Sequence, residues 1–257
     1  MPAIEVMVNG KGPFLFGVDT GGQGTARIDS SLMKKLGLKP SGAVRAGDPS
    51  EKDPQMLQEV LLQSVEVAGL RFADVKAVAR NFKASPRMAE VDGILTLNLF
   101  ADYLFTLDYP GKSVRISKGE LPPANGFEIL NYSSDGGIPV MEITFGNATA
   151  RAHIDSGNVM GAFVVPASLA EKLTWATEPV TVGRARSMSG EMEIKEGRAK
   201  EPVRLGRYEF AEPTIAFPAL SVYANVGSKI LREFTLTFDQ RNKRLRLLRS
   251  TAPGATP

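Results

Sequence analysis

Apolar and polar residues alternate in short runs along most of the chain, and Gly and Pro separate the runs. Residues 4–9 and 14–18 are two such runs, and the turn-forming segment 10–13 between them predicts a hairpin of paired strands. Residues 60–67 and 72–79 predict a second hairpin. Runs of this length with frequent turn signals favour a mainly β protein.

Helical periodicity is confined to short segments. Residues 30–38 predict one helix, with Ser30 or Ser31 as its cap and Gly37 as its end. Residues 166–173 predict a matching helix in the second half of the chain. We therefore expect one short helix in each half.

The order of the predicted elements repeats. A strand-like run ends in Asp19-Thr20-Gly21 in the first half and in Asp155-Ser156-Gly157 in the second half. Further on, the segments 93–96 and 224–227 form another matching pair. A single Asp-hydroxyl-Gly tripeptide reads equally well as a simple turn, but two copies in the same context indicate a duplicated unit.

The segment 119–126 is rich in Gly, Pro and Asn and is the best candidate for a linker. It predicts a first unit at residues 1–123 and a second at residues 124–250. Residues 251–257 show no periodicity and are expected to form a disordered tail. The polar segment 41–56, rich in Gly and Pro, is expected to be a mobile loop.

Composition excludes several classes of function. The 257 residues contain no cysteine, which rules out thiol nucleophiles, thiolate metal sites and disulfides. The net charge of +3 comes from interspersed charges of both signs, so nucleic acid is not an expected partner. No apolar run is long enough to span a membrane. We expect a monomer without a metal or cofactor.

The N-terminus lacks the charged and apolar regions of a signal peptide. This pattern fits either a cytoplasmic protein or a chain from which a signal peptide has been removed. Because a strand is predicted as early as Ile4, we favour the second case, which implies a periplasmic or secreted protein.

The paired motifs resemble those of the aspartic proteases of the pepsin and retropepsin type, which carry one Asp-(Thr/Ser)-Gly in each lobe, followed later by two apolar residues and a glycine. The chain looks most like the bacterial retropepsin-like proteins that have both lobes on one chain. The resemblance implies two similar β-barrel lobes related by a pseudo-two-fold axis. It also implies that Asp19 and Asp155 are the catalytic pair.

Two carboxylates suit this chemistry. Hydrolysis of an amide without metal or thiol needs a general base for the water and a general acid for the carbonyl oxygen, and two carboxyl groups that share one proton provide both. By resemblance, Thr20 and Ser156 would form hydrogen bonds across the pair, while Gly21 and Gly157 allow the turns. A Ser-His-Asp triad would have to use His153, the one histidine, without a nucleophile-elbow motif.

Some positions depart from the family pattern. Gly22 and Asn158 stand where pepsin-type enzymes commonly have a Ser or Thr that donates to the catalytic carboxylate, and Thr96 and Asn225 alter the distal motifs. Fewer donors would leave the pKa values of the carboxyl groups less depressed. We therefore expect an activity optimum nearer neutrality than that of pepsin.

His153 shares a strand face with Asp155, and its counterpart in the first half is Gly17. Either His153 lines a substrate cleft or it is an ordinary interior or surface histidine. The segment 187–192 is our candidate for a flap tip. The predicted substrate-binding residues are Gly17, Gly22, His153, Asn158, Met188, Ser189 and Gly190.

The sequence therefore predicts an aspartic endopeptidase that acts on extended peptide or protein segments. A second hypothesis is a non-catalytic relative that binds a protein strand in the same cleft. A third is a protease that processes its own N-terminal segment.

Overall fold

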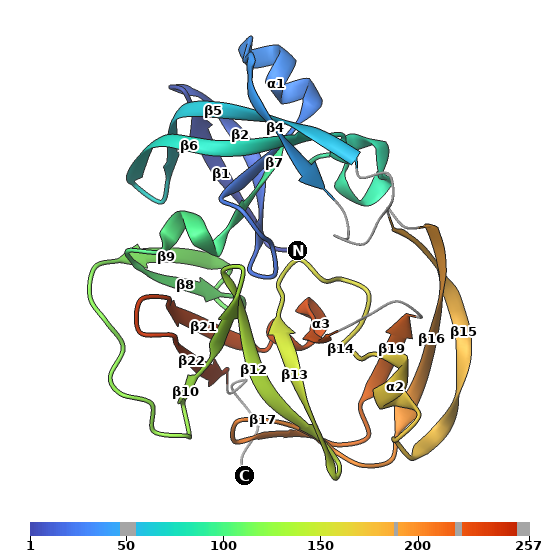
Figure 1. The fold of residues 1–257 in the computed structure, drawn as a ribbon. Helices are drawn as coiled ribbons and strands as arrows, with labels where there is room; N and C mark the ends of the chain where they lie inside the picture. The colour runs from blue at the N-terminus through green and yellow to red at the C-terminus, as the bar shows by residue number, and fades with distance from the viewer. Residues whose placement is uncertain (47–54, 188–189, 219–222, 251–257) are drawn as a thin grey trace.

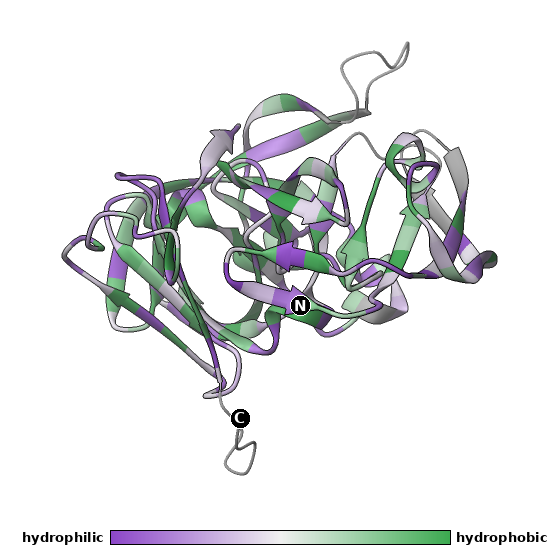
Figure 2. Cartoon of the chain, turned by 90° about the horizontal axis from the view of Figure 1, so that it is seen from below, coloured by the Kyte–Doolittle hydropathy of each residue, from purple (hydrophilic) through white to green (hydrophobic). Residues whose placement is uncertain are grey.

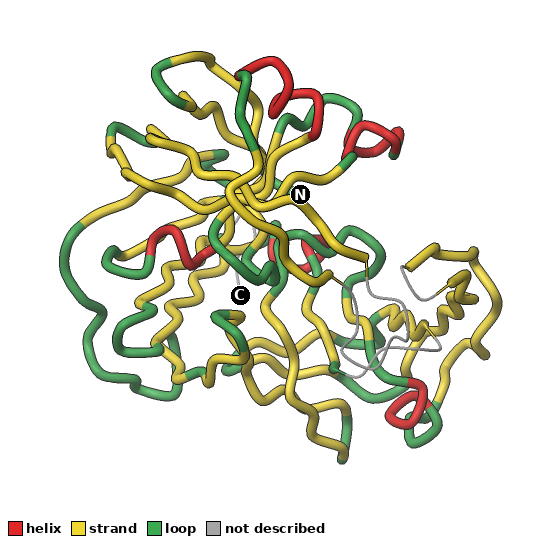
Figure 3. Tube along the Cα trace, turned by 45° about the horizontal axis from the view of Figure 1, so that its top comes forward, coloured by secondary structure: helices red, strands yellow, loops and turns green. Residues whose placement is uncertain are grey.

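The computed structural model describes residues 1–46, 55–187, 190–218 and 223–250. Strands contain 56% of the residues and helical turns 11%, which confirms the mainly β fold. Figure 3 shows strands along most of the trace, with only short helical segments between them. In the described part of the chain, no helix has the length and apolar character needed to cross a membrane.

The first sheet contains seven strands in the order β1-β2-β7-β3-β6-β5-β4. A further pairing between β1 and β5 closes six of them into a barrel, with β4 outside it. The strands are β1 (Ala3–Val8), β2 (Lys11–Asp19), β3 (Ala26–Asp29), β4 (Pro40–Ala46), β5 (Gln55–Val67), β6 (Leu70–Arg80) and β7 (Gly93–Thr96).

The second sheet has ten strands, and seven of them follow one another in the same spatial order as the first sheet: β12-β13-β20-β14-β19-β16-β15. This repeat fits a two-lobe β fold, with the first sheet in the upper part of Figure 1 and the second in the lower right. The ten strands are β11 (Ser133–Asp135), β12 (Ile138–Phe145), β13 (Ala148–Ile154), β14 (Phe163–Val164), β15 (Trp175–Ser187), β16 (Gly190–Ala199), β17 (Val203–Leu205), β18 (Tyr208–Phe210), β19 (Thr214–Pro218) and β20 (Ala224–Val226).

A third sheet draws strands from both halves of the chain. It comprises β8 (Leu104–Asp108), β9 (Ser113–Ser117), β10 (Ile129–Asn131), β21 (Phe234–Asp239) and β22 (Arg244–Arg249), in the order β10-β22-β21-β8-β9. The central pair, β8 and β21, consists of the segments that follow the two distal motifs. A domain division near residue 123 stays a prediction, because this sheet takes strands from both sides of it.

The described residues form three short α-helices. Helix α1 (Ser30–Leu36) and helix α2 (Ala167–Ala170) occupy the two predicted positions. Asp29 caps α1 by accepting a hydrogen bond from the Ser31 backbone N–H, so neither Ser30 nor Ser31 is the cap; Gly37 ends the helix with φ of 66°. The third helix, α3 (Ser228–Leu231), stands where the first half has the 3₁₀ turn Leu97–Phe100. Two further 3₁₀ turns are Phe82–Ala84 and Pro86–Met88.

The prediction of a loop over residues 41–56 was wrong for the part that the structure describes. Residues 40–46 form β4, which pairs with β5, and β5 begins at Gln55. Cross-strand hydrogen bonds to β5 override the weak strand propensity of Pro40 and Gly42. Residues 47–54 and the expected tail at 251–257 lie outside the described residues.

The alternation of side chains along β2 decides where its last residue points. Phe14, Phe16 and Val18 are buried in the core of the first sheet. Successive side chains of a strand point to opposite faces, so Gly17 and Asp19 face away from that core. Figure 2 shows such alternation of apolar and polar residues along the strands.

Substitution of Gly93 tests how tightly the residues around β2 are packed. A Cβ at this position would lie 2.6 Å from Phe16 Cζ and 2.7 Å from the Arg27 carbonyl oxygen, so backbone would have to move. We expect Gly93→Ala to lower the free energy of unfolding by about 1–3 kcal/mol in urea titrations. Gly183→Ala is the matched control, because its Cβ would meet no atom within 4 Å. Equal stability of both variants would contradict this packing.

Candidate active site

The two Asp-hydroxyl-Gly segments meet and are joined by four buried hydrogen bonds. The Thr20 hydroxyl donates to the Ile154 carbonyl at 2.6 Å and accepts from the Ser156 N–H at 2.9 Å. The Ser156 hydroxyl donates to the Val18 carbonyl at 2.7 Å and accepts from the Thr20 N–H at 2.9 Å. These are the hydrogen bonds that the resemblance implies for Thr20 and Ser156. They fix the strand ends of the two halves against each other.

Asp19 and Asp155 are brought together by this connection. A Cβ on Gly21 would lie 2.6 Å from Asp155 Oδ2, and a Cβ on Gly157 would lie 2.5 Å from Asp19 Oδ1. Each carboxyl group therefore lies against the glycine of the other motif, where a larger residue would displace it. Each also accepts a hydrogen bond from the glycine of its own motif, Gly21 N–H at 3.0 Å and Gly157 N–H at 2.8 Å.

The outer oxygens of the two carboxyl groups have donors that the sequence did not reveal. Arg27 Nη1 lies 3.2 Å from Asp19 Oδ2, and Asn225 Nδ2 donates to Asp155 Oδ2 at 2.7 Å. Asn158 holds Asn225 in place by donating to its Oδ1 at 2.7 Å. Residues on β3 and β20 thus donate to the outer oxygens, and the Asn158 backbone N–H, next to the second motif, donates to Asp155 Oδ1 at 3.0 Å. The expectation of fewer donors than in pepsin-type enzymes stays a prediction.

The environment of Asp19 favours retention of a proton. Burial of the carboxyl group and the negative charge of Asp155 raise the pKa of Asp19 from 3.8 to about 6, against the opposing effect of Arg27. A hydrogen bond between the two carboxyl groups acts in the same direction as burial. Carboxyl groups this close cannot both ionise cheaply, so the pair holds one proton up to about pH 6.

Gly22 and Thr96 compensate each other in size. A Cβ on Gly22 would lie 2.8 Å from Asp19 Oδ2 and 2.9 Å from Thr96 Cγ2. The Thr96 hydroxyl donates to the Gly24 carbonyl at 2.5 Å. The methyl group of Thr96 and the carboxyl group of Asp19 thus both occupy space that a side chain at position 22 would need.

His153 and Gly17 occupy corresponding places on β13 and β2. The His153 ring packs against Tyr223, with 4.9 Å between ring centroids, and its backbone lies beside that of Asn225. Burial lowers the pKa of His153, so the ring is neutral at pH 7. Above Gly17 lies the side chain of Met1, whose Sδ would be 2.8 Å from a Cβ there. Each of the two residues stands two positions before a motif Asp, on the same strand face as that Asp.

Tyr109, at the end of β8, is a neighbour of the pair that the sequence did not single out. Burial, followed by the charge of Asp155, raises the pKa of Tyr109, so its hydroxyl stays protonated. The hydroxyl is buried beside Ser156 without a well-formed hydrogen bond in the described part of the chain. The third sheet therefore packs directly beneath the two motifs.

The predicted flap tip at residues 187–192 falls partly outside the described residues, which include neither Met188 nor Ser189. Gly190 begins β16 and pairs with Ser187 of β15. The two strands form a long hairpin at the edge of the second sheet (Figure 1). A flap role for this hairpin stays a prediction.

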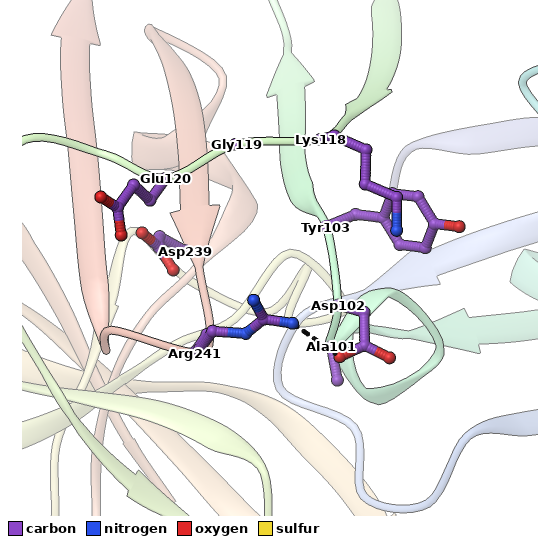
Figure 4. Close-up of a pocket in the computed structure, with 8 residues that line it drawn as sticks. All are labelled: Ala101, Asp102, Tyr103, Lys118, Gly119, Glu120, Asp239 and Arg241. Atoms are coloured by element: carbon purple, nitrogen blue, oxygen red, sulfur yellow. Dashed lines mark hydrogen bonds and ion pairs between the residues drawn. The ribbon is translucent and has the colours of Figure 1, made fainter.

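A cavity of about 290 Å³ lies away from the pair, between residues 101–103, 118–120, 239 and 241. Figure 4 shows Arg241 reaching across it to Asp102, with which it forms an exposed ion pair at 3.2 Å. Lys118 lies over the Tyr103 ring at 4.1 Å. Glu120 and Asp239 both accept hydrogen bonds from Asn242 Nδ2, so each charged group of the cavity already has a partner. Among the described residues, no group of three His, Asp or Glu side chains could hold a metal ion.

The compensation between Gly22 and Thr96 gives a test by double substitution. Gly22→Ser should lower the free energy of unfolding by about 1–3 kcal/mol through overpacking. The same substitution should cost clearly less in a Thr96→Ser background, where Cγ2 is gone and the hydroxyl is kept. Urea unfolding of all four proteins measures the difference. An equal loss in both backgrounds would show that Thr96 does not set the size of residue 22.

An aspartyl protease family model matches residues 4–99, a segment that contains Asp19 but not Asp155. The match supports assignment to the pepsin and retropepsin-like aspartic proteases, and with it a hydrolase of protease type. A search among curated proteins gave no match.

Proposed function

From the aspartyl protease match over residues 4–99, we propose that this protein is an aspartic endopeptidase in which Asp19 and Asp155 activate a water molecule between them. The observation that carries the proposal is the reciprocal arrangement of the two motifs. Each carboxyl group lies against the glycine of the other motif, and four hydrogen bonds of Thr20 and Ser156 fix that geometry. A pair of unrelated turns would need none of these contacts.

The reaction requires the pair to hold one proton. The ionised carboxylate takes a proton from water while the oxygen of that water attacks the peptide carbonyl carbon. The protonated carboxyl group donates its proton to the carbonyl oxygen, which gives a tetrahedral gem-diol intermediate. On collapse, the carboxylate takes a proton from one gem-diol hydroxyl as the C–N bond breaks, and the protonated carboxyl group gives its proton to the amine nitrogen. The pair therefore again holds one proton.

Donors around the pair have separate tasks in this scheme. The N–H groups of Gly21 and Gly157 hold the inner oxygens at 3.0 and 2.8 Å. Arg27 and Asn225 hold the outer oxygens. Fixed donors of this kind orient the carboxyl groups before the substrate arrives, so little reorganisation is needed during reaction.

One observation favours the second hypothesis, a peptide-binding relative that does not cleave. Arg27 forms an ion pair with Asp19, and its side chain is only 19% exposed. A tightly held guanidinium would keep Asp19 ionised and reduce its ability to exchange protons. The raised pKa of Asp19 argues against this outcome, because burial and Asp155 outweigh Arg27.

Cleavage of a denatured protein mixture at pH 5 separates the two hypotheses. We expect new peptide termini by mass spectrometry, inhibition by pepstatin, and at least an approximately hundredfold loss of rate in Asp19→Asn and in Asp155→Asn. Asp102→Asn is the control, because Asp102 is exposed and paired with Arg241 away from the site. Binding of peptides without cleavage by the wild-type protein would support the non-catalytic relative.

The pH dependence of cleavage tests the role of Arg27. Activity should fall as pH rises through about 6, because above that value the pair loses its shared proton. Arg27 lowers the pKa of Asp19, so Arg27→Met should move this falling limb to higher pH. Arg71→Met, which removes an exposed arginine paired with Glu66, should leave the limb in place. A limb unmoved by Arg27→Met, or an optimum below about pH 3, would contradict this account.

A further inference from the structure

Arg27 and Arg80 are neighbours on one face of the first sheet. Strands β3 and β6 are parallel, with Arg27 opposite Val78 and Asp29 opposite Arg80. Arg80 therefore lies two residues beyond Val78, on the same face as Val78. The alternate residues of β3, Ala26 and Ile28, are buried in the core. The two arginines thus face away from the core, on the side where Arg27 meets Asp19.

Arg27 is already engaged. Its Nη1 lies 3.2 Å from Asp19 Oδ2, and its Nη2 donates to the Gln23 carbonyl at 3.1 Å. The guanidinium is therefore held in one orientation. Its contacts tie this face of the sheet directly to the carboxyl pair.

Unlike the Arg27 side chain, the Arg80 side chain has no hydrogen-bond acceptor among the described residues. In the described part of the chain, its guanidinium has no ion pair, and its buried Nε has no hydrogen-bond partner. Burial, followed by the charge of Arg27, lowers the pKa of Arg80, which still remains charged at neutral pH. A half-buried guanidinium without an acceptor is costly, and an external carboxylate could supply the missing acceptor.

Carboxylates on neighbouring strands have other partners. Asp29, opposite Arg80 in register, accepts hydrogen bonds from the backbone N–H groups of Ser31, Phe82 and Lys83. The carboxylate of Glu59 on β5 lies 3.9 Å from Lys76 Nζ. The negative charge that Asp19 and Asp155 share when they hold one proton is already paired with Arg27, so within the described residues Arg80 is the one of the two arginines that has no carboxylate partner.

We propose that Arg27 and Arg80 form a carboxylate-binding subsite on the first-sheet side of the carboxyl pair, which takes an Asp or Glu side chain of the substrate. This inference rests on the proposed peptidase function and adds a preference to it. Arg80 provides the free guanidinium, which matches the two oxygens of a carboxylate in a planar fork. Arg27 contributes a second positive charge to the subsite while it keeps its ion pair with Asp19. A peptide with a neutral residue at that position leaves Arg80 without an acceptor.

A library of random decapeptides tests the subsite. Cut sites are read by mass spectrometry for the wild type, Arg80→Met, Arg80→Glu and the exposed control Arg71→Met. We expect the wild type to favour Asp and Glu at one position within about three residues of the cleaved bond. The preference should vanish in Arg80→Met, change to Lys and Arg in Arg80→Glu, and persist in Arg71→Met. Circular dichroism and thermal melts verify that each variant is folded.

Retention of the same library on immobilised protein separates this inference from the proposed function. Retention of acidic peptides that depends on Arg80, in the absence of cleavage, would support the subsite and overturn the peptidase. Cleavage by the wild type without an acidic preference, or with a preference that survives both Arg80 substitutions, would overturn the subsite alone. Absence of both cleavage and Arg80-dependent retention would overturn both.

Discussion

The reciprocal hydrogen bonds between Thr20 and Ser156 are the constraint on which the site depends. Each hydroxyl accepts from the backbone N–H of the other half and donates to a carbonyl at the end of the other strand. Both side chains are fully buried, so a missing partner would leave unsatisfied polar groups at the point where the two halves meet. This connection brings two acidic residues from distant parts of the chain into one site, and the core of each sheet supports it from behind.

Bringing two carboxyl groups together is unfavourable because they are buried and repel each other, and neighbouring side chains partly offset this cost. Burial and mutual repulsion raise the pKa of Asp19 to about 6, while Arg27 partly opposes them. On the other side, Asn225 donates to Asp155 and is itself held by Asn158. The two halves thus use different side chains, a guanidinium and an amide, for the same task. This asymmetry distinguishes two otherwise repeated halves.

The two halves resemble each other more closely in the order of their strands than in the side chains around the carboxyl pair. Seven strands of each large sheet follow one spatial order, although only the first sheet has a direct β1–β5 closure. In the second, β12 pairs with β17, and β16 and β17 are separated by a segment that contains Pro202, which has no N–H for a ladder. Hydrophobic periodicity predicted most strands correctly, because alternation is a local signal. It missed β4, whose Gly and Pro content is overridden by pairing with β5.

The sequence by itself determined the mainly β fold, the two Asp-hydroxyl-Gly motifs and the elements that repeat around them, because each depends on residues close together in the chain. Tertiary structure alone decided the partners of the carboxyl groups. Arg27 and Asn225 reach Asp19 and Asp155 through strand pairing between β3, β7 and β2 and between β20 and β13. Register and face fix such contacts, and neither can be read from spacing along the chain when the neighbouring strands come from distant segments.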